Sequence, residues 1–177
     1  MKGNEEIAAA RAAGDLTTWT ETVLAAASAH VFGTDPGRLP AELYDVLGRT
    51  AGDSDRARVA AALARCWAYS GRADRAVPFA GEAVDRASHA DRPELLADCL
   101  DAALAAHWGP DELPLRASLA GRLDDVTAHV LDPLARLQAH LWGLQVACEL
   151  LAVQDILRHL RALDLLVEES PRARFFA

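Results

Sequence analysis

The sequence predicts an all-α protein built from antiparallel helical hairpins. Ala and Leu supply most of the apolar residues, whereas Val and Ile are sparse, and this balance favours helices over strands. Capping residues and breakers divide the 177 residues into segments with apolar positions every three or four residues, and no run alternates polar and apolar residues. Because joints of about two to six residues force consecutive helices to lie side by side, we expect about nine helices in a stacked array.

Five helices are expected in the first half of the chain, each bounded by a capping residue or a breaker. The first ends at Gly14, Asp15 caps the second, and Pro40 opens the third. The expected ranges are Glu5–Ala13, Asp15–Phe32, Pro40–Gly52, Asp53–Gly71 and Ala73–His89. The fifth carries Pro78, which should fall in the first turn or bend the helix, because proline has no backbone N–H.

Four more helices are expected in the second half. Asp91 and Pro93 open the sixth, which the segment Trp108–Asp111 breaks, and Asp132 and Pro133 open the eighth. A joint near Val153 separates the eighth from the ninth.

Apolar residues at helical spacing mark the face that each helix should bury. For the third, fourth and fifth helices these are Leu43, Val46 and Leu47; Val59, Ala62, Leu63, Cys66 and Trp67; and Ala76, Ala80, Ala83 and Ala87. For the sixth to ninth they are Leu96, Cys99, Leu100, Ala103 and Leu104; Leu115, Leu119, Leu123, Val126 and Val130; Leu134, Leu137, Leu141, Leu144 and Leu151; and Ile156, Leu157, Leu160, Leu163 and Val167.

The first part of the chain is similar to the second part at one constant offset. The matched pairs include Leu24 and Leu100, Ala27 and Ala103, Leu43 and Leu119, and Leu47 and Leu123. This internal repeat of about 76 residues predicts two units of four helices, each made of two hairpins. One hairpin would then have about 38 residues, a length between those of the tetratricopeptide repeat, about 34 residues, and the HEAT repeat, about 40 residues.

One hairpin has the residue pattern of a tetratricopeptide repeat, in which small residues let two helices approach and a large one fills the groove between them. Its positions are Leu63, Ala64, Trp67, Gly71, Ala76, Ala80 and Ala83. The other hairpins depart from the pattern, since the turn glycine is missing near Ala152. We therefore expect a single domain over residues 1–170, a tetratricopeptide-like right-handed array with degenerate repeats.

The segment His107–Leu113, with the sequence HWGPDEL, is distinctive. With Glu94–Ala97 before it and Leu119 after it, it resembles the helical repeat region of large bacterial regulators, the LuxR-type ATP-binding regulators and the related AAA-ATPase or adenylate-cyclase-domain signalling proteins. The resemblance covers Ala10–Pro171 and implies a helical scaffold that senses a ligand or partner in bacterial signalling or transcriptional regulation. The chain has no P-loop, cyclase domain or basic helix-turn-helix, so only the scaffold is implied.

Charge and hydropathy exclude several function classes. A net charge of -8, a pI of about 5.2 and singly spread arginines exclude a surface for the nucleic-acid backbone. The longest uncharged stretch, Val23–Thr34, is too short to span a membrane, and the N-terminus lacks the basic-then-apolar order of a signal peptide. We therefore expect a cytoplasmic protein that binds no nucleic acid and no membrane.

Cysteine and histidine spacing indicates no metal site. Cys66, Cys99 and Cys148 lie far apart and are expected to be small buried hydrophobic side chains. No two of the six histidines have the i, i+4 spacing of ligands on one helix face. We expect no metal and no cofactor.

Carboxylates near histidines are the only acid–base candidates. Asp98 and Asp101 beside His107, or Asp124 and Asp125 near His129, could orient an imidazole. Neither set is accompanied by a nucleophile or a glycine-rich loop, and such groups on a helix usually face solvent. The expected function is therefore not enzymatic.

Aromatic and arginine residues are the candidate binding residues: Trp67, Tyr69, Trp108, Arg65, Arg72 and Arg75. The aromatics could line the concave groove and anchor a peptide or a small hydrophobic ligand, and the arginines could receive an acidic peptide. The alternative is structural, with aromatics filling gaps between alanine-rich helices and arginines forming a solvated face. An enclosed apolar pocket near Trp67 and Trp108 would indicate a small-ligand sensor, and a polar pocket with perturbed titratable groups an enzyme.

Residues 171–177 read as a tail or as the first turn of a further, truncated helix. Because terminal repeats usually carry a polar outer face, Phe175 and Phe176 should pack on the ninth helix or on a partner. Either the chain is an excerpt of a longer protein, or a second copy covers this face in a homodimer. The expected function is a non-catalytic scaffold for a protein or peptide partner, with a small-molecule inducer as the alternative.

Overall fold

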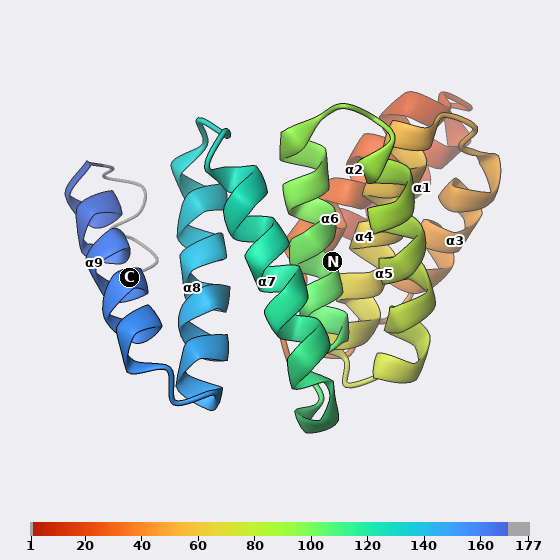
Figure 1. Ribbon diagram of the computed structural model, residues 1–177. Helices are drawn as coiled ribbons and strands as arrows, with labels where there is room; N and C mark the ends of the chain where they lie inside the picture. Colours follow the sequence, from red (N-terminus) through yellow and green to blue (C-terminus); the bar gives the residue numbers. More distant parts are fainter. Residues whose placement is uncertain (1, 170–177) are drawn as a thin grey trace.

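The computed structural model describes residues 2–169, with the side chains of residues 5–168 (Figure 1). The prediction of an all-α fold is confirmed, because these residues form nine α-helices and one short 3-10 helix, and no strand occurs among them. The α-helices are α1 Lys2–Ala12, α2 Leu16–Ser28, α3 Leu39–Arg49, α4 Asp53–Tyr69, α5 Ala73–Ser88, α6 Pro93–Ala106, α7 Leu113–Thr127, α8 Pro133–Glu149 and α9 Val153–Glu169. The 3-10 helix η1, Pro110–Glu112, precedes α7.

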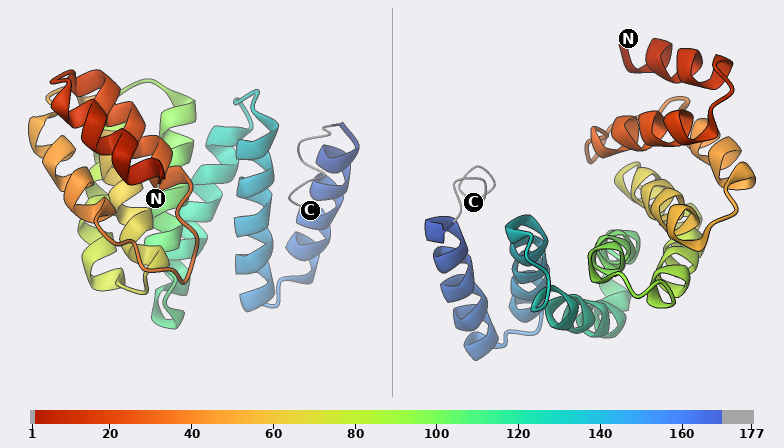
Figure 2. Two further views of the ribbon diagram at one scale, coloured as in Figure 1. Left: turned by 180° about the vertical axis from the view of Figure 1, so that it is seen from behind. Right: turned by 90° about the horizontal axis from the view of Figure 1, so that it is seen from above.

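The helices form a curved array of two layers. In the right-hand view of Figure 2, α2, α4, α6 and α8 follow one another along the inside of an arc, and each contacts the next. The helices α3, α5 and α7 each pack against the inner helix before and the inner helix after. At the two ends of the arc, α1 packs on α2 and α9 packs on α8. We call the surface formed by α2, α4, α6 and α8 the inner surface.

The centre of the array is packed mainly by alanine and leucine. The core residues predicted for α3 are buried, as are the four alanines predicted for α5. On α4, Val59, Leu63 and Cys66 are buried as predicted, whereas Trp67 is half-buried. Alanines elsewhere around α4 are buried as well: Ala57, Ala60, Ala61 and Ala64. This helix buries more than the predicted face because α2, α3, α5 and α6 all pack against it.

The end of α2 and the position of Pro78 differ from the expectation, and α3 ends at Arg49 rather than at Gly52. α2 ends at Ser28 rather than at Phe32, because the backbone N–H of Gly33 donates to the carbonyl of Tyr69 at 2.8 Å and ties the chain to the end of α4. α5 continues through Pro78, which lies in the second turn. Since proline has no backbone N–H, the carbonyl of Asp74 loses its usual helical donor there.

The predicted core of the C-terminal helices is partly wrong. Leu115 on α7, Leu141 on α8, Leu151 after it, and Leu157 and Leu160 on α9 are all exposed. The buried residues of α8 and α9 instead include Ala139, Trp142, Gly143, Val146, His159 and Leu166. The leucine pattern predicts the wrong buried faces for α8 and α9, because small and polar residues occupy the contacts between these helices.

The internal repeat and the tetratricopeptide-like stacking stay predictions. Shifted along the chain by the repeat length of about 76 residues, the ranges of α2 and α3 become 92–104 and 115–125, close to the ranges of α6 and α7. The same offset places α4 at 129–145, whereas α8 covers 133–149. The inner helices begin at Leu16, Asp53, Pro93 and Pro133, so successive hairpins have nearly equal lengths.

Candidate functional site

A chain of polar contacts crosses the inner surface and fixes the spacing of its helices. Arg58 on α4 donates two hydrogen bonds to the carboxylate of Glu21 on α2, at 2.6 and 2.8 Å. Arg65, two turns further along α4, donates to Asp98 and Asp101 on α6, at 2.5 and 2.9 Å. Asp101 also accepts a 2.8 Å hydrogen bond from the indole Nε1 of Trp142 on α8. Four helices are thereby joined side chain to side chain.

The charge balance of this contact chain holds Arg65 ionised. Burial lowers the pKa of the Arg65 guanidinium, but the charges of Asp101 and Asp98 more than offset this and raise the pKa above its ordinary value. The pKa of Tyr69, at the end of α4, is also raised, first by burial and then by the charge of Asp101. Charge-assisted hydrogen bonds of this kind favour one defined arrangement of the helices.

Aromatic residues follow the C-terminal ends of the inner helices. Phe32 lies edge-on to Tyr69, with ring centroids 6.0 Å apart, and Trp108 lies edge-on to Trp142 at 5.4 Å. Phe32 and Trp108 are 68% and 53% exposed, although each leans on an aromatic ring of the next inner helix. Large exposed aromatics held in place by a neighbour are suited to anchoring a binding partner.

Two cavities lie along the inner surface. The larger, about 250 Å³ between α6 and α8, is lined by Glu94, Ala97, Asp98, Asp101, Leu123, Val130, Asp132, Leu134, Ala135 and Gln138. Its walls thus combine leucine and valine with four carboxylates. The smaller, about 190 Å³, lies between α2, α4 and α6 and includes Arg58, Ala62 and Arg65. We call the larger one the acidic cavity.

The structure divides the predicted binding residues into two groups. Arg65 and Trp108 are connected through Asp101 and Trp142 on the inner surface, whereas the ring of Tyr69, at the end of α4, lies against Phe32. The remaining three, Trp67, Arg72 and Arg75, lie around the α4–α5 turn. Arg75 stacks over the ring of Trp67 at 4.7 Å, and Arg72 pairs with Asp74 at 3.2 Å. The acidic cavity is lined by neither Trp67 nor Trp108.

The proposed acid–base pairings with His107 and His129 are wrong. His107 contacts Glu112, while Asp98 and Asp101 bind Arg65. Asp124 lies against His140 and Arg158 rather than against His129.

The Trp-Gly-Pro-Asp break is held by a buried cation. Arg116 on α7, only 2% exposed, donates to the carbonyl of Gly109 at 2.7 Å and pairs with Glu149 at the end of α8. This arrangement fixes the loop that carries Trp108 against both neighbouring helices.

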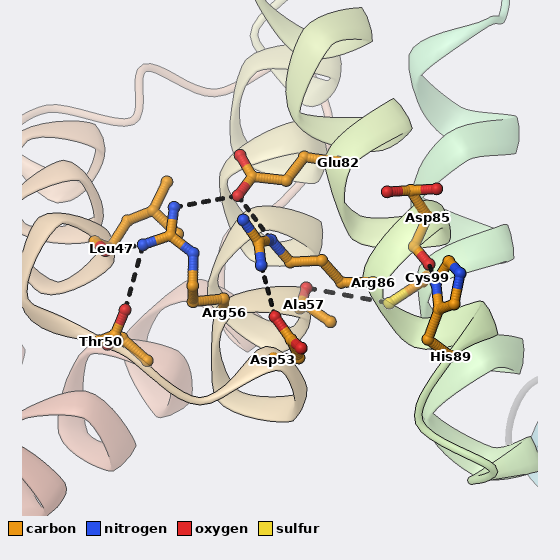
Figure 3. Close-up of polar contacts among 10 residues, drawn as sticks. All are labelled: Leu47, Thr50, Asp53, Arg56, Ala57, Glu82, Asp85, Arg86, His89 and Cys99. Atoms are coloured by element: carbon orange, nitrogen blue, oxygen red, sulfur yellow. Dashed lines mark hydrogen bonds and ion pairs between the residues drawn. The ribbon is translucent and has the colours of Figure 1, made fainter.

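A second polar network stabilises the first hairpins away from the inner surface (Figure 3). Arg56 donates to the carbonyls of Leu47 and Thr50, at 3.0 and 3.1 Å, and to Glu82 at 3.0 Å. Arg86 donates to the same carboxylate of Glu82 at 2.8 Å. Burial alone would raise the pKa of Glu82, but the two arginines lower it below its usual value. This network closes the α3–α4 joint.

The cysteine prediction is confirmed for two residues and wrong for the third. Cys66 and Cys99 are buried, and burial raises the pKa of their thiols to about 11 and about 12. Cys148 is exposed near the end of α8. Over the described part of the chain, no group of three or more His, Cys, Asp or Glu side chains is arranged to hold a metal ion. None of the described helices combines the length and hydropathy that crossing a membrane requires.

Sequence reasoning missed the partners of the candidate residues. Asp101 and Trp142 lie on other helices than Arg65 and far from it along the chain, so no local spacing joins them. It also missed a contact between His140 and His159, which lie on different helices. Phe175 and Phe176 lie outside the described residues. Comparisons with family models, curated proteins and solved structures gave no match to this chain.

Proposed function

We propose that this protein is a non-catalytic scaffold that binds a basic segment of a protein partner on its inner surface. The observation that carries the proposal is the acidic cavity between α6 and α8. Its lining residue Asp101 binds Trp142, and the exposed ring of Trp108 lies against Trp142. A lining that combines apolar side chains with carboxylates suits a side chain that has an apolar stem and a positive head, as in Lys or Arg.

The charges around the cavity favour a basic partner over an acidic one. Arg65 and Arg72 are already paired with carboxylates of the chain, so they offer little to an acidic peptide. In the part of the chain that the structure describes, no arginine pairs with Glu94 or Asp132. The net charge of -8 adds a long-range attraction for a cationic segment.

The surface is preorganised for binding. The contacts from Glu21 through Arg65 and Asp101 to Trp142 hold the four inner helices in register. A surface that is already ordered loses less conformational entropy when a partner binds. Trp108 adds an aromatic anchor of the kind that dominates interface energetics.

The resemblance to the helical regions of LuxR-type and AAA-ATPase regulators supports a sensing role for this scaffold in bacterial signalling or transcriptional regulation. We also propose that the protein acts in the cytoplasm and that its hairpins are tetratricopeptide-like repeats.

Selection from a random-peptide phage library on the immobilised protein tests the proposal. We expect enriched peptides to carry Lys or Arg near an apolar residue and to bind in fluorescence polarisation. Replacing Trp108 with alanine, or Glu94 with lysine, should weaken the best peptide by about tenfold or more, the usual size of a hot-spot loss.

Asp85→Lys is the matched control, because Asp85 is exposed on α5, away from the inner surface. It makes the same charge reversal and should leave affinity unchanged. Selected peptides without basic residues, or equal affinity for the Glu94→Lys and Asp85→Lys variants, would contradict the proposal.

A further inference from the structure

The last helix is held to the array by a buried imidazole. His159 on α9 is 3% exposed, and its ring occupies the space in which residue 143 of α8 would carry a Cβ atom. A Cβ built on Gly143 would lie under 3.0 Å from three atoms of the ring. The Nδ1 atoms of His159 and His140 are 3.2 Å apart. We call His140 and His159 the histidine pair.

Hydrogen bonding assigns the protons of the pair. Arg158 can only donate, and its Nη2 lies 3.0 Å from Nε2 of His159, so that nitrogen must accept. The neutral ring then carries its proton on Nδ1 and donates it to Nδ1 of His140. A protonated His159 would have an N–H at Nε2 facing the guanidinium N–H, as well as two adjacent positive charges.

Charged groups from three helices face the pair: Asp124 from α7, Arg136 from α8, and Asp155 and Arg158 from α9. Asp124 lies 3.4 Å from Nδ1 of His140, but it also pairs with Arg158 at 3.1 Å. Burial, followed by the charge of Arg158, lowers the pKa of His159 below its ordinary value. Burial lowers the pKa of His140 as well, against the attraction of Asp124.

We propose that the histidine pair makes the α8–α9 contact pH-sensitive: neutral imidazoles hold α9 on α8, and protonation in mildly acidic solution releases it. α9 is the end of the arc and its backbone contacts α8, so the other helices can stay folded when it leaves. Release would uncover His159 and Leu166 on α9, both of which are buried in the structure. This device is independent of partner binding on the inner surface.

Hydrogen exchange measured by mass spectrometry tests the proposal on the full chain. Exchange is compared at about pH 7.5 and about pH 5.0, the interval in which histidine titrates, after correction for the intrinsic pH dependence of the rate. Between these two pH values the protection factors of the α9 amides should fall by about tenfold or more, which corresponds to a pKa difference of about one unit. The protection factors of the α4 amides should stay constant. Constant protection of α9, or an equal fall in α4, would overturn the proposal.

Variants separate the histidine pair from other titrating groups. His159→Gln keeps an acceptor for Arg158 and His140→Gln keeps the ring of His159, and neither variant can gain the charge at its own position. Both should reduce the pH effect, as should Arg158→Gln, which removes the cation that opposes protonation. His129→Gln, at an exposed loop position, should retain the full effect. If His140→Gln and His159→Gln both kept the full effect, the pair would not be the sensor.

Discussion

Replacing Gly143 with alanine should destabilise this protein, although alanine is the better helix former. Gly143 lies inside α8, where alanine would ordinarily gain about 1 kcal/mol. Here the new Cβ would lie under 3.0 Å from three ring atoms of His159, closer than the ordinary contact of about 3.5–4.0 Å. The ring must move, and its hydrogen bonds to Arg158 and His140 move with it.

The net effect follows from three contributions. Overpacking costs about 1–3 kcal/mol, a lost hydrogen bond to a charged group costs about 1.5–3 kcal/mol, and helix propensity returns about 1 kcal/mol. Relaxation of α9 limits the total, so we expect a loss of about 2–3 kcal/mol in the free energy of unfolding. Urea unfolding followed by circular dichroism measures it, provided that the m-value stays constant.

Gly81 provides the matched control. It lies inside α5, and a Cβ built there meets no atom within 4 Å, so Gly81→Ala should stabilise the protein by about 0.5–1 kcal/mol. The two glycine-to-alanine changes should therefore have opposite signs. In the double variant Gly143→Ala, His159→Ala the steric part of the loss should disappear. If Gly143→Ala raised stability as Gly81→Ala does, the packing argument would be refuted.

Three further predictions concern polar groups. Asp101→Asn should lower the free energy of unfolding by about 1–3 kcal/mol, because Arg65 loses a charged partner, and a urea midpoint no lower than that of Asp85→Asn would contradict this. A chromogenic thiol reagent should label Cys148 rapidly in the native protein and Cys66 and Cys99 only in urea, and fast native labelling of either buried thiol would disprove their burial. The free energy of unfolding should decrease as the pH falls through about 6.5, because the histidines of the unfolded chain then bind protons that the histidine pair of the folded protein does not. The decrease should level off below the lowered pKa values of His140 and His159 in the folded protein. Equal urea midpoints at about pH 7.5 and 5.0 would contradict this.

Sequence patterns predicted the helices better than their faces. Caps and breakers placed helix starts well: Asp15 and Asp132 do accept from the backbone N–H groups two residues on, at 3.0 and 3.1 Å. The end of α2 was misplaced because a contact with Tyr69, far along the chain, decides it. Local patterns report local capping, whereas such ends depend on tertiary contacts.

The candidate site could be predicted only in part. Arg65, Tyr69 and Trp108 were recognisable as residue types suited to binding, and the structure connects Arg65 and Trp108 through Asp101 and Trp142. The acidic cavity was not predictable, since Glu94 and Asp132 line it from distant parts of the chain. The histidine pair was missed for the same reason, although a glycine inside a leucine-rich helix was a signal that another group approaches the backbone closely.

The α9 end of the arc differs from the centre in the contacts that hold it. Around α4 many alanine and leucine side chains are fully buried. Between α8 and α9 the contacts include Gly143, His140 and His159, and the Arg158–Asp124 pair joins α9 to α7, while Leu157 and Leu160 remain exposed. Because regions with few buried apolar contacts open at lower free energy, α9 should unfold before the inner helices. The inner surface can therefore keep its binding geometry while the last helix responds to protonation.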